Sequence, residues 1–166
     1  MGIDVTTWAE DCILRGTVVD PGTRLSDEVN GSGRLELSGV SVEALDDGRT
    51  FEVESLILGV DDICLLELRG HRGHQERRLG MVRHRIVAEL GPYLVAGDVH
   101  TLRGVKPLAA FRHRPAIVPL TAAVVELAGP TGIRRWEAEA VGLNQHRVSV
   151  IRDATREEPA PDLVPA

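Results

Sequence analysis

Apolar and polar residues alternate along most of this 166-residue chain, and the period of an α-helix is scarce. Residues 35–43 (LELSGVSVE) show the pattern well, with apolar side chains at alternate positions on either side of Gly39. The alternation changes phase at this glycine, as in a strand that contains a bulge. Period-two alternation is typical of half-buried β-strands, so the pattern predicts a mainly β fold.

Turn-forming residues divide the first half of the chain into short elements. Residues 20–22 (DPG) form a turn signature, and residues 23–30 (TRLSDEVN) follow, with Leu25 and Val29 four positions apart. This spacing predicts a helix of one to two turns with a single apolar stripe. We expect the strands of this half at residues 5–9, 12–19, 35–43, 51–60 and 63–68.

The second half of the chain repeats the first. Residues 93–100 (YLVAGDVH) lie 81 positions after residues 12–19 (CILRGTVV), and both segments keep the same apolar pattern. Residues 118–126 (VPLTAAVVE) lie 83 positions after residues 35–43. Such self-similarity predicts two copies of one supersecondary unit.

The repeat predicts the order β-β-α-β-β-β in each copy. At an offset of 83 positions, Glu54 and Gly59 correspond to Glu137 and Gly142. The second copy should contain a short helix at residues 106–112 and strands at residues 86–90, 93–100, 116–127, 133–143 and 147–151.

We expect two homologous, small, barrel-like units that pack as a pseudo-twofold pair. A unit of this size is marginal when alone, so the two copies should share a buried interface. The predicted parts of the chain are a first β repeat at residues 1–68, a basic connector at 69–85, a second β repeat at 86–152, and a flexible, acidic, proline-rich tail at 153–166.

The unit resembles Sm-like and SH3-like barrels in its run of strand, turn, strand, glycine and strand at residues 35–66 (LELSGVSVEALDDGRTFEVESLILGVDDICLL). It departs from Sm-like proteins because its helix follows the first two strands instead of preceding them. It also lacks the aspartate and asparagine pattern with which those proteins hold a base. Barrel closure would remove exposed strand edges.

Both copies also look like a small bacterial β-domain of uncharacterised function. The residues that carry this resemblance are the strand motif with Ile13, Gly16 and Val18, the helix RLSDEVN and the strand LELSGVSVE with its twin VPLTAAVVE. The resemblance implies a structural unit and no particular activity. In the second copy, no polar residues correspond to the polar side chains of the first helix, which are Ser26, Asp27 and Asn30.

Charge is distributed unevenly around a net value of −6. Residues 1–68 contain 4 basic and 15 acidic residues, whereas residues 69–85 contain 6 basic residues and 1 acidic residue. The basic connector is therefore expected to lie across the acidic first copy, within one molecule or between subunits. A polyanionic partner is the weaker interpretation.

Candidate metal and redox chemistry is scarce. Cys12 and Cys64 lie in apolar runs and have no cysteine counterparts in the second copy, so we interpret them as small buried hydrophobic residues. A zinc site needs three or four convergent ligands, and the HRGH sequence at residues 71–74 lacks the usual spacing. We predict no metal and no cofactor.

Catalytic motifs are also missing from the sequence. Residues 46–47 and 61–62 are aspartate pairs, but they fall at predicted turns, where aspartate is favoured for backbone reasons. The chain contains no GxSxG elbow, no P-loop and no GxGxxG that follows a strand. We therefore predict that the protein is not an enzyme.

The leading hypothesis is a non-catalytic binding or assembly module that acts through protein–protein contacts or homo-oligomerisation. Trp136 lies among charged residues and could be an exposed anchor, although a tryptophan that closes the end of a barrel is the simpler interpretation. The candidate partner-binding residues are Arg69, Arg72, Arg77, Arg78, Arg83, Arg85 and Trp136.

Two alternatives stay open. The first is an Sm-like or SH3-like regulator that contacts nucleic acid through the arginine-rich connector. The negative net charge and the scattered aromatic residues disfavour it, since single-strand binding needs stacking platforms. The second alternative is a small-molecule site between the repeats.

We expect no membrane partner and a cytoplasmic location. No apolar run approaches the roughly 20 residues that span a bilayer, and the first residues do not resemble a signal peptide.

Overall fold

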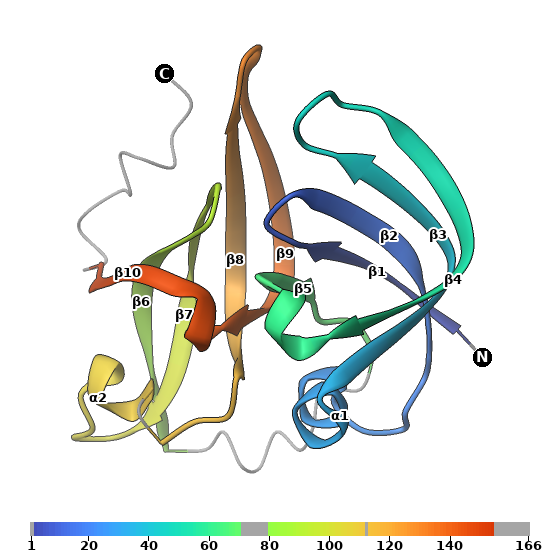
Figure 1. The fold of residues 1–166 in the computed structure, drawn as a ribbon. Helices are drawn as coiled ribbons and strands as arrows, with labels where there is room; N and C mark the ends of the chain where they lie inside the picture. The colour runs from blue at the N-terminus through green and yellow to red at the C-terminus, as the bar shows by residue number, and fades with distance from the viewer. Residues whose placement is uncertain (1, 71–79, 112, 155–166) are drawn as a thin grey trace.

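The computed structural model describes residues 2–70, 80–111 and 113–154. Within these residues, ten strands form one antiparallel sheet, and two short α-helices and two 3-10 turns connect some of the strands. The prediction of a mainly β fold is confirmed. Figure 1 shows that the two halves of the chain lie side by side.

The first half has the predicted order of elements. Strands β1 (Gly2–Trp8) and β2 (Cys12–Val19) form a hairpin, and helix α1 (Leu25–Ser32) follows. Helix α1 ends at Gly33, whose φ of 73° is in the left-handed region that favours glycine. The remaining elements of this half are β3 (Arg34–Ala44), β4 (Thr50–Gly59), the 3-10 turn η1 (Val60–Asp62) and β5 (Leu65–Glu67).

The second half repeats this order. Its elements are β6 (Met81–Leu90), β7 (Tyr93–Leu102), α2 (Pro107–Phe111), β8 (Ile117–Gly129), β9 (Gly132–Asn144), the 3-10 turn η3 (Gln145–Arg147) and β10 (Val148–Asp153). Strand β6 begins at Met81, so the last residues of the expected connector belong to a strand.

Strand pairing gives both halves the same register. Ile13 of β2 faces Glu43 of β3, and Leu94 of β7 faces Glu126 of β8, at the predicted offsets of 81 and 83 positions. Each ladder then shifts register at one place, between Arg15 and Thr17 in β2 and between Ala96 and Asp98 in β7. A bulge at equivalent places bends both units in the same way.

The alignment of β4 with β9 differs from the prediction. Phe51 faces Val42 in the first half, and Trp136 faces the equivalent Val125 in the second, so these strands correspond at an offset of 85 positions. Gly59 is therefore equivalent to Asn144 and not to Gly142. The offset changes because the β8–β9 hairpin holds two more residues than the β3–β4 hairpin.

The sheet order is β10-β6-β7-β8-β9-β5-β1-β2-β3-β4. Each half contributes five neighbouring strands, and the halves meet where β9 pairs with β5. Since β9 is equivalent to β4, the halves meet through non-equivalent strands. The prediction of a pseudo-twofold pair is therefore wrong for this contact, because a twofold axis would bring equivalent strands together.

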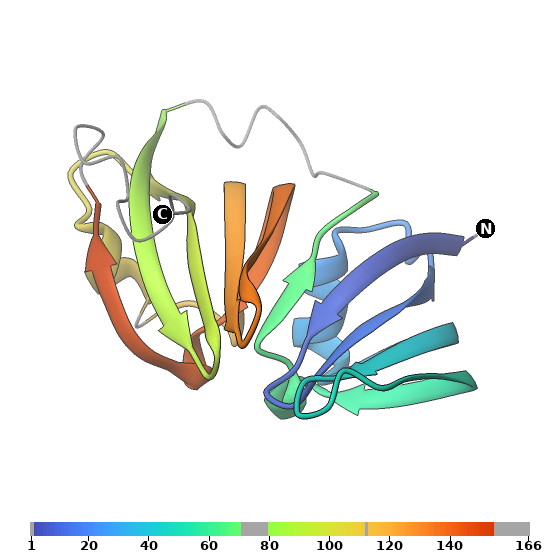
Figure 2. The same cartoon turned by 90° about the horizontal axis from the view of Figure 1, so that it is seen from above.

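The order ends at β4 and at β10, which pair on one side only within the described residues. In the same part of the chain, no ladder of backbone pairs links β4 to β5 or β9 to β10. Figure 2 shows β10 and β4 at opposite ends of the molecule.

Two large apolar clusters form the core, and each receives residues from both halves. The cluster centred on the second half contains Trp8, Ile13 and Leu65 of the first half. The cluster centred on the first half contains Ile117 of the second half. The expectation that the halves share a buried interface is confirmed by this mixed core.

Candidate assembly surface

The contact between the halves, here called the joint, is built on three residue pairs between β5 and β9. Leu65 faces Leu143, Leu66 faces Gly142, and Glu67 faces Val141. The four apolar side chains at these positions, those of Leu65, Leu66, Val141 and Leu143, are fully buried. The joint therefore resembles the interior of a domain more than a surface contact.

Asn144 closes one end of the joint. Its buried Nδ2 donates to the carbonyl oxygens of Val60, at 3.0 Å, and of Ile63, at 2.8 Å. Its Oδ1 accepts from the backbone N–H of His146 at the start of η3, at 3.0 Å. One side chain thus caps a turn of the second half while it holds the loop before β5 of the first half.

Asn30 of α1 binds the second half in the same manner. Its Nδ2 donates to the carbonyl oxygen of Ile117 at 2.9 Å, and its Oδ1 accepts from the N–H of Ile117 at 2.8 Å. This paired contact mimics a strand neighbour at the start of β8. The polar residue that has no counterpart in the second helix therefore serves the contact between the halves.

Aromatic side chains cross the joint at its other end. The rings of Trp8 and Trp136 meet edge to face, with centroids 5.9 Å apart. The hydroxyl of Tyr93 donates to the carbonyl oxygen of Ala9 at 2.5 Å. Burial raises the pKa of the Tyr93 hydroxyl well above its ordinary value, so this group stays a neutral donor.

An ion pair lies beside Trp136. Arg134 lies over the ring of Trp136, with the guanidinium carbon 4.8 Å from the ring centroid, and binds the carboxylate of Glu43 through both terminal nitrogens. The hydrogen bond from Arg134, together with the charges of Arg134 and Arg15, lowers the pKa of Glu43. Glu43 belongs to the first half and Arg134 to the second, so the pair spans the joint.

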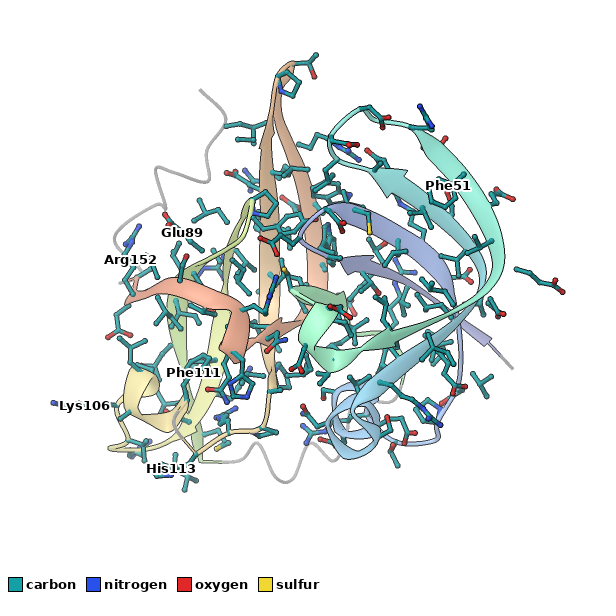
Figure 3. All side chains as sticks on the ribbon, in the orientation of Figure 1. Phe51, Glu89, Lys106, Phe111, His113 and Arg152 are labelled. Carbon is teal, nitrogen blue, oxygen red and sulfur yellow. The ribbon has the colours of Figure 1, made fainter. Side chains whose placement is uncertain are left out.

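The free edges expose large apolar side chains. Ile57 and Phe51 on β4 are 64% and 49% exposed, and Val150 on β10 is 51% exposed. Figure 3 shows Phe51 on the β4 side of the molecule, with Glu89 and Arg152 together on the β10 side. Sequence reasoning missed these residues because alternation alone does not say which predicted strand ends a sheet.

The candidate residues from the sequence lie in different places. Trp136 is half-buried and packs against the core of the second half. Arg69 is exposed and lies 3.2 Å from Glu67, while Arg83 is exposed on β6. Arg85 contacts Asp98 at 3.3 Å and donates to the carbonyl oxygen of Ala122 at 2.9 Å. The other candidates, Arg72, Arg77 and Arg78, lie outside the described residues.

Two hollows lie between the halves. The smaller holds about 80 Å³ and is lined by residues that include Arg24, Ser26, Leu68 and Thr121. The larger holds about 370 Å³ and is lined by residues that include Glu67, Arg69, Glu137 and Glu139. Pockets for organic ligands begin at roughly 300 Å³, so the smaller hollow has room for a few water molecules, and the larger lies just above that limit.

The cysteines are both free within the structure. Cys64 is buried and Cys12 is half-buried. Burial and the neighbouring Asp11 raise the pKa of the Cys12 thiol to about 11, so it carries little thiolate near neutral pH.

In the part of the chain that the structure describes, no three side chains of His, Cys, Asp or Glu gather as metal ligands. No helix of that part is long and apolar enough to cross a membrane.

Comparison with known proteins gives no relative for this chain. No protein-family model matches it, and neither a curated protein nor a solved structure matches it significantly.

Proposed function

We propose that this protein is a non-catalytic assembly module, built from two homologous barrel-like units, that associates with further protein chains and foremost with copies of itself. The observation that carries the proposal is that β4 and β10 end the strand order of the described residues and expose the side chains of Phe51, Ile57 and Val150. An exposed edge strand with apolar side chains is a template for pairing with another chain.

The homology of the two units is supported by their shared register and by the bulge at equivalent places. The joint also supports the assembly function, because it demonstrates that strands of these units can pair edge to edge over a buried apolar contact. Strands β4 and β10 are equivalent to the two strands of the joint, so their outer edges are suited to the same edge-to-edge pairing.

The described basic residues pair within the molecule. Arg69 pairs with Glu67 of the acidic first half, whereas Arg85 pairs with Asp98 of the second half. Of these two contacts, the first alone fits a connector that lies across the first copy.

Size-exclusion chromatography with multi-angle light scattering tests the proposal. The untagged protein is run from low to high micromolar concentration, at low and high salt, with absorbance recorded at 260 and 280 nm. We expect a mass above the 18.0 kDa of one chain, without nucleic acid. A monomer at every concentration contradicts the proposal, and a monomer that carries nucleic acid removable by salt would favour the connector as the binding site instead.

A further inference from the structure

We infer that the free edges of β4 and β10 pair with each other between copies of this chain, head to tail, in the register of the internal joint. The inference rests on the proposed assembly function and specifies its partner and its geometry. Its starting point is that β10 is equivalent to β5 and β4 is equivalent to β9. One β5–β9 type contact exists inside the molecule. The strands for a second one lie at its two ends, and within the described residues each of them pairs on one side only.

The register of the external contact follows from the internal one. Trp8 faces Leu65, and its equivalent Glu89 faces Val150, so Val150 takes the place of Leu65. On the other strand, Leu58 takes the place of Leu143 at the offset of 85 positions. The expected pairs between copies are Val150 with Leu58, Ile151 with Ile57, and Arg152 with Leu56.

The exposed apolar side chains fall at the positions that such a contact would bury. Val150, which is 51% exposed, occupies the position of the fully buried Leu65. Phe51, which is 49% exposed, occupies the position of Trp136, which packs against Trp8 across the joint. Ile57 is the most exposed of these residues, at 64%, and it lies at the centre of the expected pairing.

One pair of opposite charges would lie close together across the expected contact. It is not the equivalent of the ion pair between Glu43 and Arg134 that spans the joint, because Glu126, which corresponds to Glu43, is buried in its own half. Arg152 would face Leu56, and Glu54 lies two residues from Leu56 on the same face of β4.

Neither edge contains a proline among the residues that would pair. Every backbone N–H is therefore present in residues 55–59 of β4 and residues 150–153 of β10. The register shift of β10 lies between Val148 and Val150, before the residues that would pair. The two edges lie at opposite ends of the molecule (Figure 2), so each bound copy presents a new free edge. Such a contact forms a ring if the rotation closes and a filament if it does not.

The external contact should be weaker than the joint. Glu89 stands where the joint has Trp8, and Gly59 stands where the joint has Asn144. The external contact thus lacks the aromatic pair and the side chain that binds two carbonyl groups. We expect reversible assembly whose extent rises with concentration.

Disulfide trapping tests this geometry. In a background with Cys12→Ser and Cys64→Ala, two single-cysteine proteins are prepared, Leu58→Cys and Val150→Cys. The equivalent joint pair, Leu65 and Leu143, is of the non-hydrogen-bonded type, since the flanking Asn144 N–H donates to Cys64. Facing side chains in such a pair are about 4.5–5.5 Å apart, within reach of a disulfide.

The two proteins are mixed, oxidised mildly and identified by intact mass spectrometry. We expect the mixed Leu58→Cys/Val150→Cys dimer to form at least about tenfold faster than either homodimer. A matched control replaces Leu58→Cys by Val53→Cys on the same strand, and it should not give this preference. Equal rates, or a preference for homodimers, would overturn the head-to-tail pairing.

Light scattering of the wild-type protein distinguishes failure of the β4–β10 contact from failure of the assembly function. An oligomer without the mixed disulfide overturns the β4–β10 contact and leaves the assembly function standing. A monomeric protein without the mixed disulfide overturns both.

Discussion

The indole rings of Trp8 and Trp136 meet across the joint at 76°, with their centroids 5.9 Å apart. They are the two tryptophans of the chain, and each comes from a different half. Edge-to-face contacts of this kind add about 0.5–1.5 kcal/mol beyond the apolar area that they bury. The pair therefore fixes how the halves meet at the end of the joint opposite Asn144.

Replacing Trp136 should destabilise the folded chain. We expect Trp136→Ala to lower the free energy of unfolding by about 3 kcal/mol, because the substitution removes the ring contact and opens a gap against the core. Phe51→Ala is the matched control at the equivalent position, and it should cost less than about 1 kcal/mol in dilute protein because Phe51 is half exposed. Urea unfolding followed by circular dichroism measures both values. Equal costs would show that Trp136 contributes nothing to the joint.

Asn30 should contribute more to stability than its half-buried position suggests. Asn30→Ala leaves the N–H and the carbonyl of buried Ile117 without their partner, at an expected cost of about 2 kcal/mol. Glu28→Ala, on the exposed side of the same helix, serves as the control and should change stability by less than about 0.5 kcal/mol. If Asn30→Ala also falls within that range in urea unfolding, the contact between α1 and β8 does not hold the halves together.

The ion pair between Glu43 and Arg134 should make stability depend on pH. The pKa of Glu43 is lowered from its ordinary 4.5 in the folded state, so its contribution is present above that pH. The contribution is lost as the pH falls through the lowered value. A double-mutant cycle with Glu43→Gln and Arg134→Gln measures the coupling from thermal unfolding. We expect coupling near neutral pH that fades in strong acid, and coupling of constant size would contradict this account.

Thr7 offers a substitution that should stabilise the protein. Its hydroxyl is buried without a hydrogen-bond partner among the described residues. Thr7→Val keeps the shape of the side chain and removes that unsatisfied group, so we expect a gain of about 1 kcal/mol in the free energy of unfolding. A loss of comparable size would mean that the hydroxyl has a bound water or another partner.

The elements of each half follow from local patterns in the sequence. Alternation at residues 35–43 predicts β3, the bulge at Gly39 is expected from the change of phase, and Leu25 with Val29 predicts α1. These features depend on neighbours in the chain. The repeat also predicts which residues of the two halves are equivalent. After residue 50, however, the longer second hairpin increases the offset between equivalent residues by two positions.

The joint does not follow from local patterns. Alternation does not reveal that β9 pairs with β5, because the choice depends on contacts between segments more than 70 residues apart. The exposed positions of Ile57 and Val150 depend on that choice in turn. Asn30 is one of three polar residues of the first helix that have no counterpart in the second copy, and the structure shows that it binds across the joint.

The mass of an edge variant in solution tests the head-to-tail assembly most directly. Ile57→Lys places a charge at the centre of the expected β4–β10 contact, and Val19→Lys is the control at a position that is 78% exposed and away from both edges. We expect light scattering to give the mass of one chain, 18.0 kDa, for Ile57→Lys and an unchanged oligomer for wild type and Val19→Lys. An oligomer of the same mass in all three proteins would contradict assembly through these edges.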